Sequence, residues 1–324
     1  MGDTVLWFIL VFDATLRVST PLVLAAFAGM FAERSGIVDI GLEGKMLGAA
    51  FGAATVALVT DSAWLGLLAG IGVSVTLAMI HAFACVTHRG NQVVSGMALN
   101  IMVAGLAPAL SLAWFGQGGQ TPMIEEGGRF RPIHFPFADR LSDVPFVGEV
   151  YSELISGHNI IVYVAMGMVP LAGWFIYRTR FGLRLRAVGE SPEAVDTAGI
   201  SVAGMRYRAM IICGILCGVA GTYLAIAMNT LFIRDMSAGM GYLALAALIF
   251  GKWKPLPTLL ACFLFAFADA VQARLQGVDV PGVGIIPVQA IQALPYVLTV
   301  LLLAGFVGKA VPPKASGIPY VKDR

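Results

Sequence analysis

The stretch AWLGLLAGIGVSVTLAMIHAFACV, residues 63–86, decides the fold class. It contains no Lys, Arg, Asp or Glu. A helix of about 20 apolar residues is long enough to cross the hydrocarbon core of a bilayer. This stretch therefore predicts a membrane-spanning helix, and the sequence on either side of it repeats the pattern.

The composition of the whole chain agrees with a membrane protein. Of its 324 residues, 58% are hydrophobic and 12% are charged, and the mean hydropathy is +0.83. Soluble domains are about 45–50% apolar and about 25% charged. The low charge disfavours a soluble enzyme, a disordered chain and a nucleic-acid binder, and the net charge of +2 gives no general affinity for polyanions. The four cysteines all lie in apolar stretches without a metal-ligand pattern, which predicts buried thiols.

Other apolar stretches predict further crossings. The run 4–12 is too short to cross by itself, so it either takes part in a crossing or lies in the membrane interface. The remaining spans are expected near 15–32, 36–60, 63–86, 92–115, 159–177, 208–232, 240–250, 256–275 and 285–308. The predicted fold is an all-α polytopic transmembrane helix bundle of about nine spans, within a range of 8–10.

The distribution of basic residues predicts the orientation. The loop 178–208 contains six arginines, which places it in the cytoplasm by the positive-inside rule. Alternation of the spans then places the segment 116–157, where acids outnumber arginines, outside the membrane. The N-terminus is expected outside and the C-terminus in the cytoplasm.

The same alternation predicts two halves of inverted topology. In each half the second element is interrupted by glycine and polar residues, at 36–60 and at 233–252. Paired broken helices at matching positions of inverted halves mark binding or translocation sites in transporters. We therefore expect two broken membrane helices around such a site.

The cytoplasmic loop contains a short capped segment, ESPEAVDTAG, residues 190–199. Ser191 is a suitable N-cap, Pro192 fits the first helical position, and Gly199 suits the left-handed residue that ends a helix. So short a helix is marginal in water, so either the bundle or a partner protein must hold it. The alternative is a plain surface cap.

This segment resembles the EAA-x-x-x-G loop of ABC-importer permeases, with Val195 in place of the second alanine. The longer run FGLRLRAVGESPEAVDTAGISVAGMRYRAM, residues 181–210, is similar to the loop of the ribose and branched-chain amino acid permease superfamily. The stretches 31–53, 240–256 and 287–303 resemble its nucleoside and purine branch.

The resemblance implies a non-enzymatic permease subunit of a binding-protein-dependent ABC importer, with residues 1–324 forming one transmembrane permease domain in the plasma (inner) membrane. A separate ATPase would bind ATP, so the chain itself needs no cofactor, and no metal or nucleic acid is expected. The ATPase would dock on the coupling residues Ser191, Pro192, Glu193, Ala194, Asp196 and Gly199.

Other partners follow from the same resemblance. A second permease chain, identical or related, would complete the pathway among membrane lipids, and an external binding protein would deliver the substrate. The segment 116–157 is either its docking surface or a flexible connector. Nucleosides or purine-like compounds are the expected substrates, and sugars and branched-chain amino acids are the alternatives.

Candidates for the substrate pathway are polar or aromatic residues within the predicted spans, because ionisable and polar groups in a membrane are costly and often functional. They are Asp39, Glu43, Asn100, Asn229, Tyr242, Phe250, Asp269, Gln289 and Gln292. Asp39 and Glu43 would share one face if this segment is helical. The alternative is that Glu43 pairs with Lys45 or Arg34. The amides and aromatics either bind substrate or link helices.

Two other classes of function are an ATPase and an ion-coupled secondary transporter. The string DIGLEGKM, residues 39–46, superficially resembles a phosphate-binding loop, but Asp39 replaces its first glycine and Met46 its Ser or Thr, so we expect no ATP hydrolysis by this chain. An ion-coupled secondary transporter, using Asp39, Glu43 and Asp269 as ion sites, is the alternative to an ABC permease.

Overall fold

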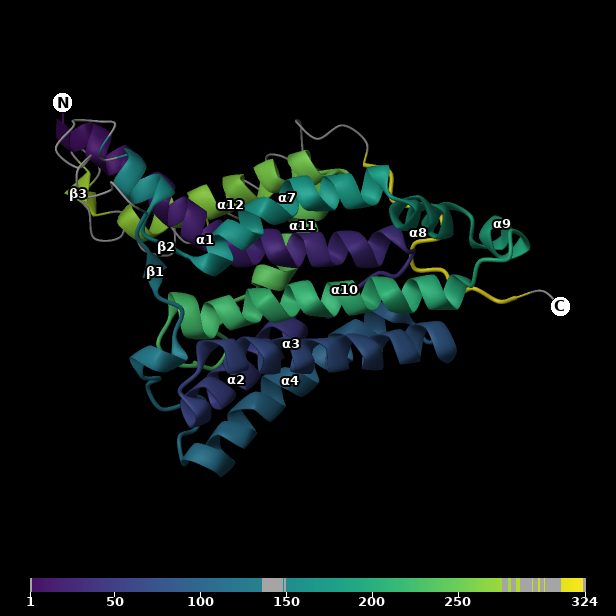
Figure 1. Cartoon of the computed structure of the whole chain (residues 1–324), viewed down its shortest axis with the longest axis horizontal. Helices are drawn as coiled ribbons and strands as arrows, with labels where there is room; N and C mark the ends of the chain where they lie inside the picture. The colour runs from purple at the N-terminus through teal and green to yellow at the C-terminus, as the bar shows by residue number, and fades with distance from the viewer. Residues whose placement is uncertain are drawn as a thin grey trace.

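The computed structural model describes residues 2–135, 148, 150–275 and 310–322, with isolated positions from 279 to 300. It is an elongated bundle of helices with the N-terminus at one end and the C-terminus at the other (Figure 1). Within the described residues, seven helices are long and apolar enough to cross a membrane, and one shorter apolar helix accompanies them. This confirms the all-α fold class.

The first half of the bundle consists of four long helices. They are α1 (Gly2–Arg34), α2 (Leu42–Thr60), α3 (Ala63–Ala82), extended by the π-helical turn η1 (Phe83–Thr87), and α4 (Gln92–Phe115). The side chains of Ser62 and Asn91 accept hydrogen bonds from backbone N–H groups in the first turns of α3 and α4, which explains why these helices begin there.

The first helix shows how the run 4–12 continues. This run is the beginning of α1, which has 33 residues. At 1.5 Å per residue this helix is about 50 Å long, well beyond the hydrocarbon core of about 30 Å. No glycine or proline separates residue 12 from the next apolar run, so the helix continues through it.

The remaining elements begin with short connections, η2 (Glu126–Gly128), β1 (Pro132–Ile133), η3 (Val150–Ile155) and β2 (His158–Asn159), in which β1 and β2 pair antiparallel. Helices follow: α7 (Ile160–Arg178), α8 (Arg180–Glu190), α9 (Pro192–Thr197), α10 (Val202–Tyr223) with its π-helical turn η4 (Leu224–Met228), α11 (Met240–Phe250) and α12 (Pro255–Leu275). Two-residue strands β3 (Asp279–Val280) and β4 (Gly284–Ile285) pair antiparallel. Apart from isolated positions, the expected span 285–308 lies outside the described residues.

The packing of the helices follows the inverted halves. Helix α1 packs against α11 and α12, just as α10 packs against α2 and α3. Within the halves, α2 packs on α3 and α11 packs on α12. Exchanging α1 with α10, α2 with α11 and α3 with α12 therefore preserves these neighbours. The two central helices, α1 and α10, also pack against each other.

Small residues allow α10 to lie very close to α3 and α2. A Cβ atom added to Gly218 would lie 2.6 Å from the Cα atom of Ile71, and one added to Gly221 would lie 2.1 Å from the carbonyl oxygen of Met46. Gly214 and Gly218 are four residues apart and face α3 together. This is the small-xxx-small pattern of helix interfaces in membranes.

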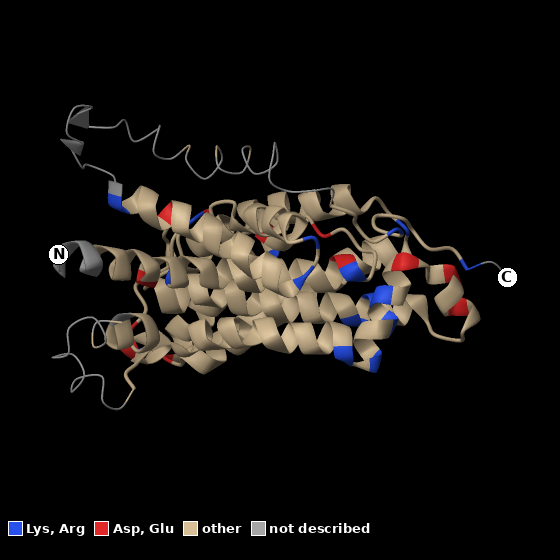
Figure 2. Cartoon of the chain, turned by 90° about the horizontal axis from the view of Figure 1, so that it is seen from above, with Lys and Arg blue, Asp and Glu red and all other residues tan. Residues whose placement is uncertain are grey.

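Many of the charged residues lie toward the two ends of the bundle (Figure 2). We call the end that carries α8 and α9 the α8–α9 end. Arg34 lies there, because its guanidinium donates to the Tyr177 hydroxyl at 3.3 Å and to the Trp253 carbonyl oxygen at 2.6 Å. The segment from 116 to 135 lies at the opposite end, where Thr121 N donates to the carbonyl oxygen of Phe232. Helices α8 and α9 of the arginine-rich loop 178–208 therefore share one end of the bundle with Arg34.

Candidate functional site

The first break in the bundle is the non-helical loop 35–41, which joins α1 to α2. Asp39 lies in this loop, before α2 begins, so the condition for a helical face shared with Glu43 is not met. Its carboxylate forms an ion pair with Lys45, and both side chains are completely buried. Asp39 Oδ1 also accepts a hydrogen bond from Gly41 N at 3.1 Å. A buried charge needs such a partner, since its desolvation is costly.

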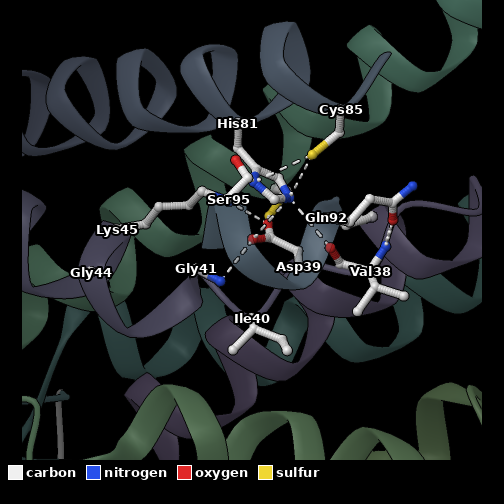
Figure 3. Close-up of polar contacts among 12 residues, drawn as sticks. Val38, Asp39, Ile40, Gly41, Gly44, Lys45, His81, Cys85, Gln92 and Ser95 are labelled. Carbon is white, nitrogen blue, oxygen red and sulfur yellow. Dashed lines mark hydrogen bonds and ion pairs between the residues drawn. The ribbon is translucent and has the colours of Figure 1, made fainter. Parts of the chain in front are cut away.

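Three neighbouring helices hold this loop (Figure 3). His81 of α3 lies with Nε2 3.3 Å from the Val38 carbonyl oxygen and 3.9 Å from Asp39 Oδ1. Gln92 of α4 accepts from Val38 N at 2.7 Å. Cys213 of α10 lies with Sγ 3.2 Å from Asp39 Oδ2. The loop is therefore fixed from three sides inside the bundle.

Sequence reasoning did not identify the partners of Asp39 in this cluster, which are Lys45, His81 and Cys213, nor Gln92, which binds Val38. The available signal was a polar or ionisable residue in or next to an apolar span, which is the criterion that selected Asp39. The pairing of these residues follows from the loop geometry, which the sequence does not specify. Asp39 itself is enclosed, so in this structure it contacts the cluster and not an open cavity.

The second break precedes α11, and the two breaks meet at Glu43. The Glu43 carboxylate accepts hydrogen bonds from Ser237 Oγ at 2.6 Å, from Gly239 N at 2.8 Å and from Gly241 N at 2.6 Å. It therefore satisfies backbone donors at the N-terminus of α11, where a negative charge is favoured. Within the described part of the chain, Lys45 pairs with Asp39, Arg34 bonds to Tyr177 and Trp253, and neither pairs with Glu43, contrary to the alternative drawn from the sequence.

Asn100 and Tyr242 complete this contact. Asn100 Oδ1 accepts from Gly44 N at 2.8 Å, and its amide nitrogen donates to the Ile40 carbonyl oxygen at 3.0 Å and to the Tyr242 hydroxyl at 2.8 Å. Tyr242 is 46% exposed, so part of its side chain is not covered by the described residues. We call Glu43, Asn100 and Tyr242 the break junction, because they link both broken elements.

The other pathway candidates lie elsewhere. Asn229, which directly follows η4, donates to the carbonyl oxygen of Leu224, the first residue of η4, and the ring of Phe250 packs against that of Phe265. Asp269 is half-buried on α12. Among the described residues, none of these three is hydrogen-bonded to the break junction. Gln289 and Gln292 lie outside the described residues.

The expected coupling segment forms a helix, α9. Pro192 occupies its first turn, and Gly199, with φ +77°, ends it in the left-handed conformation, as predicted. Ser191 does not cap it as predicted: in the part of the chain that the structure describes, its side chain makes no capping hydrogen bond. Val195 is buried and anchors α9, whereas Glu193 and Ala194 are exposed. The amphipathic helix α8 was not anticipated.

Comparison with known proteins agrees with this architecture. The family model described as branched-chain amino acid transport system / permease component matches residues 11–306. The chain is 37% identical to the nucleoside ABC transporter permease protein NupC of Lactococcus lactis, over 94% of this chain and 95% of NupC. It is also 37% identical to the guanosine ABC transporter permease protein NupQ of Bacillus subtilis, over 97% of each chain.

The name of a third relative contains a different substrate, glucose. TsgC13 of Haloferax volcanii, an ABC transporter permease protein provisionally assigned to glucose, is 37% identical over 82% of this chain and 78% of its own length. Both the family match and the long apolar helices describe a multi-pass membrane protein. The chain therefore belongs to the family of branched-chain amino acid transport system permease components.

Proposed function

We propose that this chain is the permease subunit of an ABC importer that carries nucleosides across the plasma (inner) membrane. The observation that carries the proposal is the break junction, where broken elements from the two inverted halves meet at Glu43, Asn100 and Tyr242. Such meetings mark substrate sites in transporters with inverted repeats. NupC and NupQ, with nucleoside and guanosine in their names, support the substrate class.

The substrate would pass beside Tyr242. The exposed part of this ring offers a stacking surface for a nucleobase, and stacking on an aromatic side chain is worth about 1–3 kcal/mol per base. Met97 and Ile101 of α4 are exposed beside Asn100 on the same helix. A second permease chain, identical or related, would cover this apolar surface and enclose the pathway between the two chains.

The α8–α9 end would face the cytoplasm. Its arginines satisfy the positive-inside rule, and the exposed residues Glu193 and Ala194 of α9 are available to a separate ATPase that binds the ATP. An external binding protein would deliver the substrate to the opposite end. Nucleotide binding to the ATPase would then shift the bundle between two packings, because a ligand favours the state that it binds more tightly.

Reconstitution tests this function. Vesicles would contain the chain with its co-purified permease partner, ATPase and binding protein, and radiolabelled guanosine would be the probe. We expect uptake that requires ATP and is unaffected by a protonophore. Guanosine uptake by the chain alone, driven by an ion gradient, would instead establish a secondary transporter and refute the proposal.

Two substitutions test whether the substrate passes the break junction. Tyr242→Phe retains the ring and loses the hydrogen bond to Asn100, whereas Tyr242→Ala loses both. If the ring stacks on the base, Tyr242→Ala lowers guanosine uptake much more than Tyr242→Phe. Equal uptake by the two variants would remove Tyr242 from the pathway.

A sugar is the second candidate substrate, and the 37% identity to TsgC13 favours considering it. A neutral sugar and a neutral nucleoside both need hydrogen-bonding groups rather than a fixed counter-charge, and Asn100 suits either. Radiolabelled glucose in the same vesicles discriminates between them: ATP-dependent uptake of glucose without uptake of guanosine would reassign the substrate.

A further inference from the structure

The C-terminal segment 313–322 folds back over the α8–α9 end instead of leaving the molecule. Ala315 N donates to the carbonyl oxygen of Gly189, the penultimate residue of α8, at 2.9 Å. Gly317 N donates to the carbonyl oxygen of Gly36 in loop 35–41 at 3.1 Å. The side chains of Pro313 and Ala315 are buried there. The segment thus adds backbone hydrogen bonds between α8 and the first break.

Arg206 of α10 is part of the same contact, and it is 1% exposed. Its Nε donates to the carbonyl oxygen of Ser35 at 3.2 Å, and its Nη2 donates to that of Ile318 at 3.3 Å. One guanidinium therefore links the loop of the first break to the C-terminal segment. A planar guanidinium with several fixed donors can do this, whereas a lysine ammonium is a single point of charge.

Gly36 shows how little space this contact leaves. Its φ of +86° lies in the left-handed region, and a Cβ atom there would be 3.0 Å from the Ala315 carbonyl oxygen and 3.1 Å from Arg206 Nη2. A displacement of the C-terminal segment would therefore push directly on the loop. Asp39, three residues further along, belongs to the buried cluster that fixes this loop in the bundle.

The far end of the segment reaches α9. Lys322 Nζ lies 3.3 Å from Asp196 Oδ1, and Tyr320 lines a pocket of about 380 Å³ together with Asp196, Gly199 and Arg89. The segment accordingly contacts the proposed docking helix at one end and the first break at the other. Between the two contacts lie only a few residues.

We propose that segment 313–322 and Arg206 form a mechanical link that transmits movement of α9 to the first membrane break, with Arg206 as a positioning residue. The inference rests on the proposed function, since it assumes that an ATPase moves α9. The proposal predicts that breaking this link lowers the amount of substrate transported per ATP hydrolysed, while ATP hydrolysis continues. The substitutions proposed below change no residue of α9.

The experiment compares Ala315→Pro with Lys314→Ala in the reconstituted complex. Proline removes the N–H that Ala315 donates to Gly189, whereas Lys314 is exposed and serves as the matched control. Guanosine uptake, ATP hydrolysis and co-purification of the ATPase are measured together. We expect Ala315→Pro to retain the ATPase and its hydrolysis while uptake per ATP falls about fivefold or more, the lower end of ordinary coupling between sites.

A second variant, Arg206→Lys, alters the same link and keeps the buried positive charge. We expect it to lower uptake per ATP in the same direction as Ala315→Pro, with the complex still assembled. If uptake and hydrolysis fall in parallel in both variants, or if both keep the ratio of the unmodified complex, the link is merely structural and the inference is wrong. If the unmodified complex shows no ATP-dependent uptake, the proposed function itself fails, which is a separate outcome.

Discussion

At the scale of single residues, the buried ion pair of Asp39 and Lys45 determines how the first break is held. Both charges are removed from water, so each depends on the other. Breaking a buried pair by removing one partner typically costs about 3–5 kcal/mol, whereas replacing the whole pair can be nearly neutral. We therefore predict that the effects of substituting Asp39 and Lys45 on the free energy of unfolding are strongly non-additive.

Lys45→Met should lower the free energy of unfolding by about 3–5 kcal/mol, because it leaves the Asp39 carboxylate buried without its cation. The double variant Asp39→Asn with Lys45→Met should recover most of this loss, because no charge is then buried without a partner. Unfolding of the purified protein in detergent, followed by tryptophan fluorescence, measures both. Simple additivity of the two substitutions would show that the pair does not act as a unit.

Glu43 is the second residue whose charge has a structural role, because its carboxylate accepts the hydrogen bonds that join the two breaks. In Glu43→Gln an amide N–H₂ replaces one of the two acceptor oxygens and faces the backbone N–H of Gly239 or Gly241, so at least one partly buried donor loses its partner. An unsatisfied buried donor costs about 1–3 kcal/mol. We expect lower thermal stability and slower guanosine uptake.

The matched control for this variant is Glu126→Gln. Glu126 is exposed and pairs with the exposed Arg131 at 2.8 Å, so its contribution to stability should be small. Thermal unfolding and uptake of the two variants are compared side by side. If Glu43→Gln behaves like Glu126→Gln, the carboxylate does not hold the two breaks together.

At the scale of elements, the position of α10 depends on its glycines. Gly221→Ala should destabilise the bundle by about 1–3 kcal/mol, the usual cost of overpacking, since the added methyl group would meet the backbone of α2. Gly167→Ala in α7 is the control, because a Cβ atom there has no neighbour within 4 Å. Thermal unfolding in detergent measures the difference. Equal melting temperatures would mean that α10 can shift away without cost.

The elements also show how far the sequence predicts this fold. Apolar runs gave the positions of α3, α4, α7 and α12, because the bilayer length requirement leaves a clear pattern. The ends of α9 at Pro192 and Gly199 were predicted from local backbone preferences. The capping role of Ser191 was not borne out, because a side-chain bond depends on the path of the chain before the helix.

The candidate site was predictable only in part. The sequence selected Glu43, Asn100 and Tyr242 as polar or aromatic residues in apolar surroundings, and the structure brings these three together. Their common position follows from the contact of α2 with α11, two elements separated by about 200 positions in the sequence. A single sequence carries no direct signal for such a contact, so Asn229 and Asp269 were equally good candidates.

At the scale of the whole molecule, the inverted halves explain why the two breaks meet. The exchange that relates α1 to α10 also relates α2 to α11, and these two broken elements contact each other. Gly241 permits this approach, because a Cβ atom there would be 2.5 Å from the backbone nitrogen of Glu43. Movement of one half against the other would therefore act first on the break junction, which is where the alternation of access is expected to occur.

Orientation is the last property of the whole molecule that can be tested with simple variants. The α8–α9 end should lie in the cytoplasm, because moving its cluster of arginines across the membrane during insertion is disfavoured. Glu193→Cys lies on the exposed surface of α9, and Met123→Cys lies at the opposite end on a residue that is 69% exposed. The four native cysteines are buried and should not react with a bulky charged maleimide. In intact cells this impermeant reagent should label Met123→Cys only, and Glu193→Cys should become reactive after the membrane is opened. Labelling of Glu193→Cys in intact cells would place α9 outside, beyond the reach of any cytoplasmic ATPase.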